Sequence, residues 1–156
     1  MKEVRVRLAS PDDAEALTGL NQAFNEVTRP ISKVRETLLR NETVGPDREI
    51  VAVAVCQEEV VGFACARANL SFCYDNPSGE ITEMYVKEKY RRQKAATALV
   101  AFLEQELAKL GVEEVRILTG SDNYAAQAAY TANGYAIDDE LVLHKTIYPV
   151  AQTAKD

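Results

Sequence analysis

Residues 81–111 constrain the fold of this chain most, because they combine a strand, a basic loop and a long amphipathic helix. Residues 84–86 end an apolar run of the kind that favours strands. Beyond the loop, leucines recur at spacings of three and four residues, as on one buried face of a helix, at Leu99, Leu103, Leu107 and Leu110. Gly111 follows where helices commonly end in the left-handed conformation. The segment therefore predicts a strand that leads into a helix packed on the core.

The loop in this segment, residues 87–94, holds five basic residues and one acidic residue, a net charge of +4 on a chain of net charge −6. The first turn of a helix leaves backbone N–H groups unpaired and carries partial positive charge. Together with nearby cations, such a turn suits a pyrophosphate. The alternative is that the cations only solvate a loop. The contrast with the acidic remainder of the chain favours the anion site.

Composition indicates one soluble globular domain, with 47% apolar and 27% charged residues. We expect a single domain over residues 1–149 and a frayed tail over residues 150–156. No apolar run approaches the roughly 20 residues that span a bilayer, and the first ten residues lack the apolar core of a signal peptide. The acidic balance argues against nucleic acid as a partner. These features predict a cytoplasmic protein.

Neither a disulfide framework nor a metal site is expected. Cys56, Cys65 and Cys73 form no C-x-x-C pair, and three is an odd number for disulfide pairing. No cluster of residues has metal-ligand spacing. The single histidine, His144, lies in an expected edge strand and is interpreted as structural or exposed.

Periodicity predicts an α+β domain in the order βααβββαβαββ, a mixed, mostly antiparallel sheet flanked by helices. Ser10 and Asp13 have capping-box spacing at the start of the first helix, and Asp122 or Asn123 is expected to cap a short alanine-rich helix. The third strand is expected to continue as far as Phe72. The expected strands are residues 4–8, 50–56, 60–68, a central strand ending at 86, 115–118, 135–137 and 141–146.

The basic loop and the start of its helix resemble motif A of the GNAT superfamily, the acyl-CoA-dependent N-acetyltransferases. The family pattern is Q/R-x-x-G-x-G/A, and here Arg91 fills its first position and Ala96 its last. Lys94 stands where the middle glycine belongs. If that position is left-handed, lysine costs about 1–2 kcal/mol; if its φ is negative, the cost is small and the ammonium can contact a phosphate. A loop that binds weakly or not at all remains the alternative.

A second match covers residues 123–135, NYAAQAAYTANGY, which resembles the family element N-x-x-A-x-x-x-Y-x-x-x-G-F/Y. The resemblance implies that Asn123 and Ala126 help to hold the pantetheine arm and that Tyr130 lies beside the sulfur of coenzyme A. A phenol with a pKa of about 10 can protonate the departing thiolate. The alternative is that Tyr130 is an aromatic residue packed on the sheet.

The resemblance also implies acetyl-CoA as co-substrate, with direct transfer to an amine through a tetrahedral intermediate. An amine with a pKa of about 10 must lose a proton before it attacks. Glu80 and Glu83 are the candidate bases, with Glu83 slightly favoured. Their offset puts them on opposite faces of an ideal strand, although a bulge would alter this. In relatives, backbone N–H groups at the positions of Met84 and Val86 bind pantetheine or polarise the acetyl carbonyl. The full expected cofactor set is Met84, Tyr85, Val86, Arg91, Arg92, Gln93, Lys94, Ala95, Ala96, Thr97, Asn123 and Ala126.

Acidic residues in the elements expected to form the acceptor site favour a small cationic amine. The expected substrate-binding residues beside the two candidate bases are Glu26, Asp75, Asp138, Asp139 and Glu140. The motifs look most like the aminoglycoside 3-N-acetyltransferase branch, which implies an aminoglycoside acceptor and leaves open a role in antibiotic resistance or in ordinary metabolism. A protein or peptide N-acetyltransferase and a non-catalytic coenzyme A sensor are the alternatives. The apolar closing strands also suit a homodimer.

Overall fold

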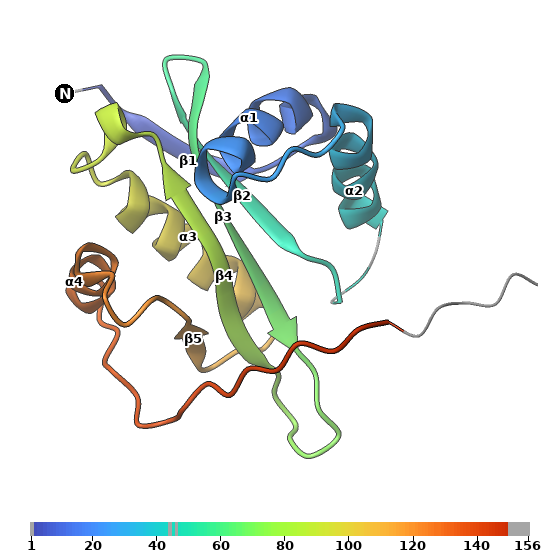
Figure 1. Ribbon diagram of the computed structural model, residues 1–156, viewed down its shortest axis with the longest axis vertical. Helices are drawn as coiled ribbons and strands as arrows, with labels where there is room; N and C mark the ends of the chain where they lie inside the picture. Colours follow the sequence, from blue (N-terminus) through green and yellow to red (C-terminus); the bar gives the residue numbers. More distant parts are fainter. Residues whose placement is uncertain (1, 44, 46, 150–156) are drawn as a thin grey trace, which may run out of the picture.

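A five-stranded sheet, ordered β1-β2-β3-β4-β5, forms the centre of the computed structural model (Figure 1). The structure describes residues 2–43, 45 and 47–149. The first four strands are antiparallel, and β5 pairs with β4 in parallel. The strands are β1 (Val4–Leu8), β2 (Ile50–Cys56), β3 (Glu59–Asn69), β4 (Ser78–Val86) and β5 (Val115–Ile117). This arrangement confirms the predicted α+β fold with a mixed, mostly antiparallel sheet.

Helices cover both faces of the sheet and make three layers (Figure 1). The helices are α1 (Ala14–Asn25), α2 (Ile31–Thr43), α3 (Ala95–Lys109) and α4 (Tyr124–Ala132), with short 3-10 turns at η1 (Pro11–Asp13) and η2 (Glu88–Tyr90). Side chains of β2 alternate between the two layers. Ala52 and Ala54 pack in the cluster under α3, whereas Val53 packs in the cluster under α1 and α2.

The predicted buried face of α3 is confirmed. Leu99, Leu103 and Leu107 are fully buried, and Leu110 is partly buried against the same cluster. Gly111 has a φ of +87°, the left-handed conformation expected just after the helix. Packing on the sheet therefore holds α3 firmly along its length.

An ion pair attaches the first helix to β1. Arg7 donates two hydrogen bonds, at 2.7 and 2.9 Å, to the carboxylate of Asp13, which also accepts the Ser10 amide at 2.8 Å. Burial opposes the charge of Asp13, but these bonds outweigh it and lower the pKa of the carboxyl. The capping box expected from Ser10 and Asp13 is confirmed.

Two expectations about strands are wrong. Strand β3 ends at Asn69 instead of continuing to Phe72, because residues 70–77 form the loop that reverses the chain into β4. The predicted strands over 135–137 and 141–146 do not form: residues 135–149 pair with no strand among the described residues. An alternating apolar pattern favours an extended chain, but a strand also needs a neighbouring backbone to complete its hydrogen bonds. The expected tail, residues 150–156, lies outside the described residues.

Candidate active site

Strand β4 extends beyond its parallel neighbour β5, and this leaves an opening in the sheet. Strand β5 pairs with β4 only from Gly79 to Ile81, and β4 continues to Val86 without it. A cavity of about 300 Å³ occupies the opening. Its lining comes from α1, β4, the end of β5, the β5–α4 connection and α4, namely Phe24, Ile81, Thr82, Glu83, Met84, Ile117, Leu118, Thr119, Gly120, Asn123, Ala126 and Tyr130.

A β-bulge puts the two candidate bases on one face of the sheet. Glu83 lies opposite Cys65 and Ile81 lies opposite Ala66, so Thr82 is the extra residue of β4. Glu80 then lies opposite Arg67, on the same face as Glu83. The two carboxylates therefore do not point to opposite faces as in an ideal strand. Glu83 lines the cavity, while Glu80 lies outside the lining and accepts a hydrogen bond from Asn69 at 3.4 Å.

The cavity reaches both faces of the sheet. Glu83 lies on the same face of the sheet as its partner Cys65, the face that packs under α1 and α2. Phe24 of α1 lines the cavity on that side. Met84 and Tyr130 pack against the opposite cluster, under α3. Two reactants can therefore approach the same point of β4 from opposite sides of the sheet.

The free edge of β4 presents backbone N–H groups to this opening. Lys87 donates its amide to the Val61 carbonyl of β3 at 2.9 Å. Because amides alternate along a strand, those of Val86 and Met84 point away from β3, toward the cavity side. The Val86 carbonyl, which points the same way, accepts a hydrogen bond from Arg91 Nε at 2.8 Å.

The basic loop divides into structural cations and available ones. Lys87 forms an ion pair with Glu59 at 2.6 Å. Arg91 donates the hydrogen bond to the Val86 carbonyl of β4, and its guanidinium carbon lies 5.5 Å from the centre of the Tyr85 ring. Lys89, Arg92 and Lys94 form no ion pair with the described residues, but Lys89 Nζ lies 5.0 Å from the centre of the Tyr90 ring, whereas Arg92 and Lys94 have no such contact there. Two cations therefore remain for an anion.

Lys94 adopts the left-handed conformation, the more strained of the two expected for this position. Its φ is +63° and its ψ is 11°, and Arg92 also has a positive φ of 62°. Lysine therefore occupies a left-handed position in which the family pattern has glycine. Successive right-handed and left-handed residues aim their backbone N–H groups into a shared concavity that binds anions.

The first turn of α3 has unpaired donors. The first amide of the helix to find a backbone acceptor is that of Ala98, which donates to the Lys94 carbonyl at 2.9 Å. Among the described residues the amides of Ala95, Ala96 and Thr97 have no backbone acceptor, and no side chain caps this helix. These residues fit a diphosphate by geometry and charge.

Tyr130 combines a position on the cavity with a protonated phenol. Burial raises the pKa of its hydroxyl above the ordinary value. Its ring meets the ring of Tyr135 edge to face, with centroids 6.3 Å apart. The Tyr135 hydroxyl is engaged elsewhere, donating to Glu104 of α3 at 2.8 Å. Tyr130 is therefore the phenol that faces the opening.

Asn123 is the N-cap of α4, which settles the choice between it and Asp122. Its Oδ1 accepts the amide of Ala126 at 3.2 Å. Gln127 donates to the carbonyls of Gly120 and Ser121 at 2.9 and 3.1 Å, which holds the β5–α4 connection against the helix. At the other end, Asn133 Nδ2 lies 3.4 Å from Thr97 Oγ1, so α4 ends beside the first turn of α3.

Glu49 is a carboxylate near the candidate bases that the sequence analysis did not select. Burial and the neighbouring Glu83 raise its pKa, while Arg67, 3.9 Å away, opposes the shift. Arg67 of β3 lies between Glu49, the residue just before β2, and Glu80 of β4. Only the register of three strands brings these groups together, and no local motif signals it.

The remaining expected residues do not line the cavity. Glu26 is the left-handed C-cap of α1, and Asp75 lies in the β3–β4 loop. Asp138 accepts the Asp139 amide at 2.7 Å, and Glu140 lies 3.6 Å from Arg116 of β5. Gln93 donates to the Lys89 carbonyl at 3.1 Å, within its own loop.

Within the described residues, no helix is long and apolar enough to cross a membrane. Among these residues, no group of three or more histidine, cysteine, aspartate or glutamate side chains could hold a metal ion. Cys56 and Cys65 are buried free thiols, and Cys73 is an exposed one.

Comparison with known proteins matches residues 14–135 to the acetyltransferase (GNAT) family. A search of curated proteins finds no match. Among solved structures, the aminoglycoside N-acetyltransferase AAC(6')-Iy in complex with CoA has a TM-score of 0.79 at 17% identity, covering 94% of this chain and 96% of its own. An aminoglycoside acetyltransferase from an uncultured soil metagenomic sample, in complex with trehalose, has a TM-score of 0.78 at 16% identity, covering 94% and 97%. The ribosomal-protein-alanine N-acetyltransferase of Brucella melitensis biovar Abortus 2308 has a TM-score of 0.74 at 16% identity, covering 92% and 100%.

Proposed function

Because this chain belongs to the acetyltransferase (GNAT) family, and is thus an acyl-CoA-dependent N-acetyltransferase, we propose that it acetylates a primary amine of a small cationic acceptor. An aminoglycoside is the first candidate. The observation that carries the proposal is the cavity through the sheet, with Glu83 on one face and Tyr130 on the other. Acetyl-CoA would approach from the side of α3 and α4, and the amine from the side of α1 and α2.

The first turn of α3 would hold the diphosphate of coenzyme A. The unpaired amides of residues 95–97 and the cations Arg92 and Lys94 supply donors and charge. Asn133 and Thr97 link this turn to the end of α4, which carries Tyr130. A thioester extending from the turn along the free edge of β4 would meet the amides of Met84 and Val86.

Each side chain then has one task in the transfer. Glu83 accepts a proton from the acceptor ammonium, so that the nitrogen lone pair can bond to the thioester carbon. The amides of Met84 or Val86 stabilise the charge that develops on the carbonyl oxygen. As the carbon–sulfur bond breaks, the electron pair goes to sulfur, which takes a proton from Tyr130. The nitrogen loses its second proton to restore Tyr130, and Glu83 releases its own to solvent.

Charge and similarity together support the acceptor class. Glu49, Glu80 and Glu83 lie near one another on the acceptor side, a set that attracts an acceptor with several ammonium groups. The similar structures with aminoglycoside acetyltransferase activity support the same class, and the one whose name gives a regiochemistry is of the 6' type. The 3-N branch therefore has no support beyond the motif resemblance.

A peptide N-terminus is the second candidate acceptor, favoured by similarity to the ribosomal-protein-alanine N-acetyltransferase. The test is release of coenzyme A, followed with a thiol reagent, over a panel of aminoglycosides, polyamines and peptides with free N-termini. Turnover with aminoglycosides and not with peptides is the expected result. Turnover only with peptides would support the second candidate. Saturable acetyl-CoA binding without turnover on any amine would contradict both.

A matched pair of isosteric variants identifies the base. We expect Glu83→Gln to lower kcat about 100-fold, and Glu80→Gln to lower it less than about tenfold, because only Glu83 lines the cavity. Both variants remove one negative charge from the same face of β4, so a general loss of attraction for a cation would raise KM in both. Equal losses of kcat would contradict the assignment to Glu83.

A further inference from the structure

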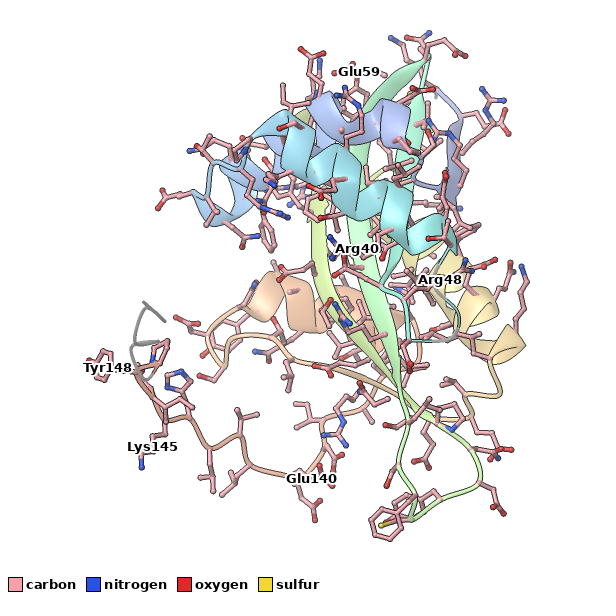
Figure 2. The ribbon with its side chains drawn as sticks, turned by 90° about the vertical axis from the view of Figure 1, so that its right-hand side faces the viewer. Arg40, Arg48, Glu59, Glu140, Lys145 and Tyr148 are labelled. Atoms are coloured by element: carbon pink, nitrogen blue, oxygen red, sulfur yellow. The ribbon has the colours of Figure 1, made fainter. Side chains whose placement is uncertain are left out.

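Glu59 has a carboxylate with two close partners that take no part in the proposed transfer. It is the first residue of β3, and Figure 2 shows it at the opposite end of the molecule from Glu140. Its Oε1 accepts a hydrogen bond from Lys87 Nζ at 2.6 Å, and its Oε2 accepts one from the Tyr90 hydroxyl at 2.8 Å. Glu59 does not line the cavity, so any role it has in the reaction must act through these two partners.

The two partners stand at the two ends of the 3-10 turn η2. Lys87 is the N-cap of η2 and Tyr90 is its last residue. One carboxylate of β3 therefore holds both ends of the turn against the sheet. Hydrogen bonds to an ionised group are stronger than those between neutral groups. The bonds from Lys87 and Tyr90 lower the pKa of Glu59, so the carboxylate stays ionised at neutral pH.

The hairpin between β2 and β3 gives Glu59 a fixed support. Glu59 pairs with Cys56 in the sheet, and only Gln57 and Glu58 connect the two strands. Both connecting residues have positive φ, 49° and 64°, as in the tight type I′ turn whose twist matches that of the sheet. Figure 1 shows this hairpin and η2 at the same end of the sheet. The carboxylate is therefore held by the strand ladder itself and not by a long loop.

The segment that Glu59 anchors leads directly into the proposed diphosphate site. Four residues after Tyr90 the chain enters α3, where Ala95 is buried in the core. Packing of α3 thus fixes one end of the basic loop, and Glu59 fixes the other. Between these two supports lie Arg92 and Lys94, both with positive φ. A loop held at both ends loses less conformational entropy when it binds a ligand.

We infer that Glu59 is a positioning residue for acetyl-CoA, which holds η2 against the sheet so that Arg92 and Lys94 keep their orientation toward the diphosphate. The inference rests on the proposed diphosphate site at the first turn of α3. Coulomb's law alone predicts the opposite effect, because a carboxylate near an anion site repels the anion and its removal would tighten binding. The sign of the change in affinity therefore distinguishes positioning from simple charge.

Isothermal titration calorimetry of the full chain with acetyl-CoA tests the role. Glu59→Ala is expected to raise the Kd about tenfold, and Tyr90→Phe, which keeps the ring and loses one of the two bonds, about threefold. Glu58→Ala is the matched control, because it removes the same charge from the same hairpin and its exposed side chain pairs with Arg5 at 3.5 Å. Its Kd is expected to equal that of the unmodified chain.

Two further readouts exclude a general loss of structure. The double variant Glu59→Ala, Tyr90→Phe is expected to bind acetyl-CoA no more weakly than Glu59→Ala alone, because both changes break the same link. In steady-state kinetics with an amine that gives turnover, Glu59→Ala is expected to raise the KM for acetyl-CoA and to keep kcat within about twofold. Additive losses of affinity, or a loss confined to kcat, would overturn the positioning role.

Arg92→Ala tests the diphosphate site separately, with an expected rise in Kd of about tenfold. An unchanged Kd in Arg92→Ala would contradict the proposed diphosphate site and the inference with it. A weaker Arg92→Ala beside an unchanged or tighter Glu59→Ala would leave the site intact and overturn the positioning role alone. An equal loss of affinity in Glu58→Ala would assign the effect to the charge of the hairpin and would also overturn that role.

Discussion

The end of α4 lies beside the start of α3, yet different interactions stabilise the two helices. Helix α3 buries five side chains against the sheet, and its N-terminus has no side-chain cap and a strained lysine at the cap position. Helix α4 has no fully buried side chain, and Asn123 caps it through a hydrogen bond. A helix held by packing can leave its first turn unpaired for a ligand, whereas a helix with little packing needs its own cap.

The first way to sharpen this comparison is to remove one side chain from each helix. Leu103→Ala in α3 is expected to lower the free energy of unfolding by about 3 kcal/mol, because a fully buried leucine leaves a cavity. Tyr124→Ala in α4, where the side chain is 74% exposed, is expected to change it by less than about 0.5 kcal/mol. Denaturant unfolding of both variants measures the difference, and similar losses would contradict the contrast.

The chemistry of α4 gives the next effect. Tyr130→Phe is expected to lower kcat about 100-fold with little change in the affinity for acetyl-CoA, because only the proton donor is removed. Since burial raises the pKa of Tyr130, the phenol stays protonated at neutral pH, and the alkaline fall in rate should begin only above the ordinary phenol pKa of about 10. Steady-state kinetics across pH, with Tyr124→Phe as the matched control, is the measurement. An unchanged kcat in Tyr130→Phe would end the acid assignment.

The smallest effects are expected at the two cap positions, and they have opposite signs. Asn123→Ala should lower the free energy of unfolding by about 1 kcal/mol, because the Ala126 amide loses its acceptor. Lys94→Gly should raise it by about 0.5 kcal/mol, because glycine removes the left-handed cost of about 1–2 kcal/mol and adds a smaller entropy to the unfolded chain. Thermal unfolding of the two variants measures both signs. Destabilisation by Lys94→Gly would mean that the lysine side chain contributes more than its backbone strain costs.

Local patterns in the sequence predict much of this fold. The leucine spacing of α3, the stop at Gly111 and the cap at Asn123 each depend on residues a few positions apart. Features that depend on pairing between distant strands were not predictable in the same way. The shared face of Glu80 and Glu83 follows from the bulge at Thr82, and the position of Glu49 follows from the register of β2 with β3.

The segment that follows α4 shows the same limit from the other side. Its alternating apolar residues predicted a strand over 141–146, but the segment pairs with no strand among the described residues. The pattern gives the conformation that the segment favours but does not identify the backbone with which it pairs.

The central claim is that the unpaired first turn of α3 binds the diphosphate of coenzyme A. Backbone amide chemical shifts, recorded while acetyl-CoA is titrated into the protein, test it most directly. The account predicts large shifts for the amides of Ala95, Ala96 and Thr97, and smaller ones for the capped amide of Ala126. Saturable binding that leaves these three amides unmoved would contradict it.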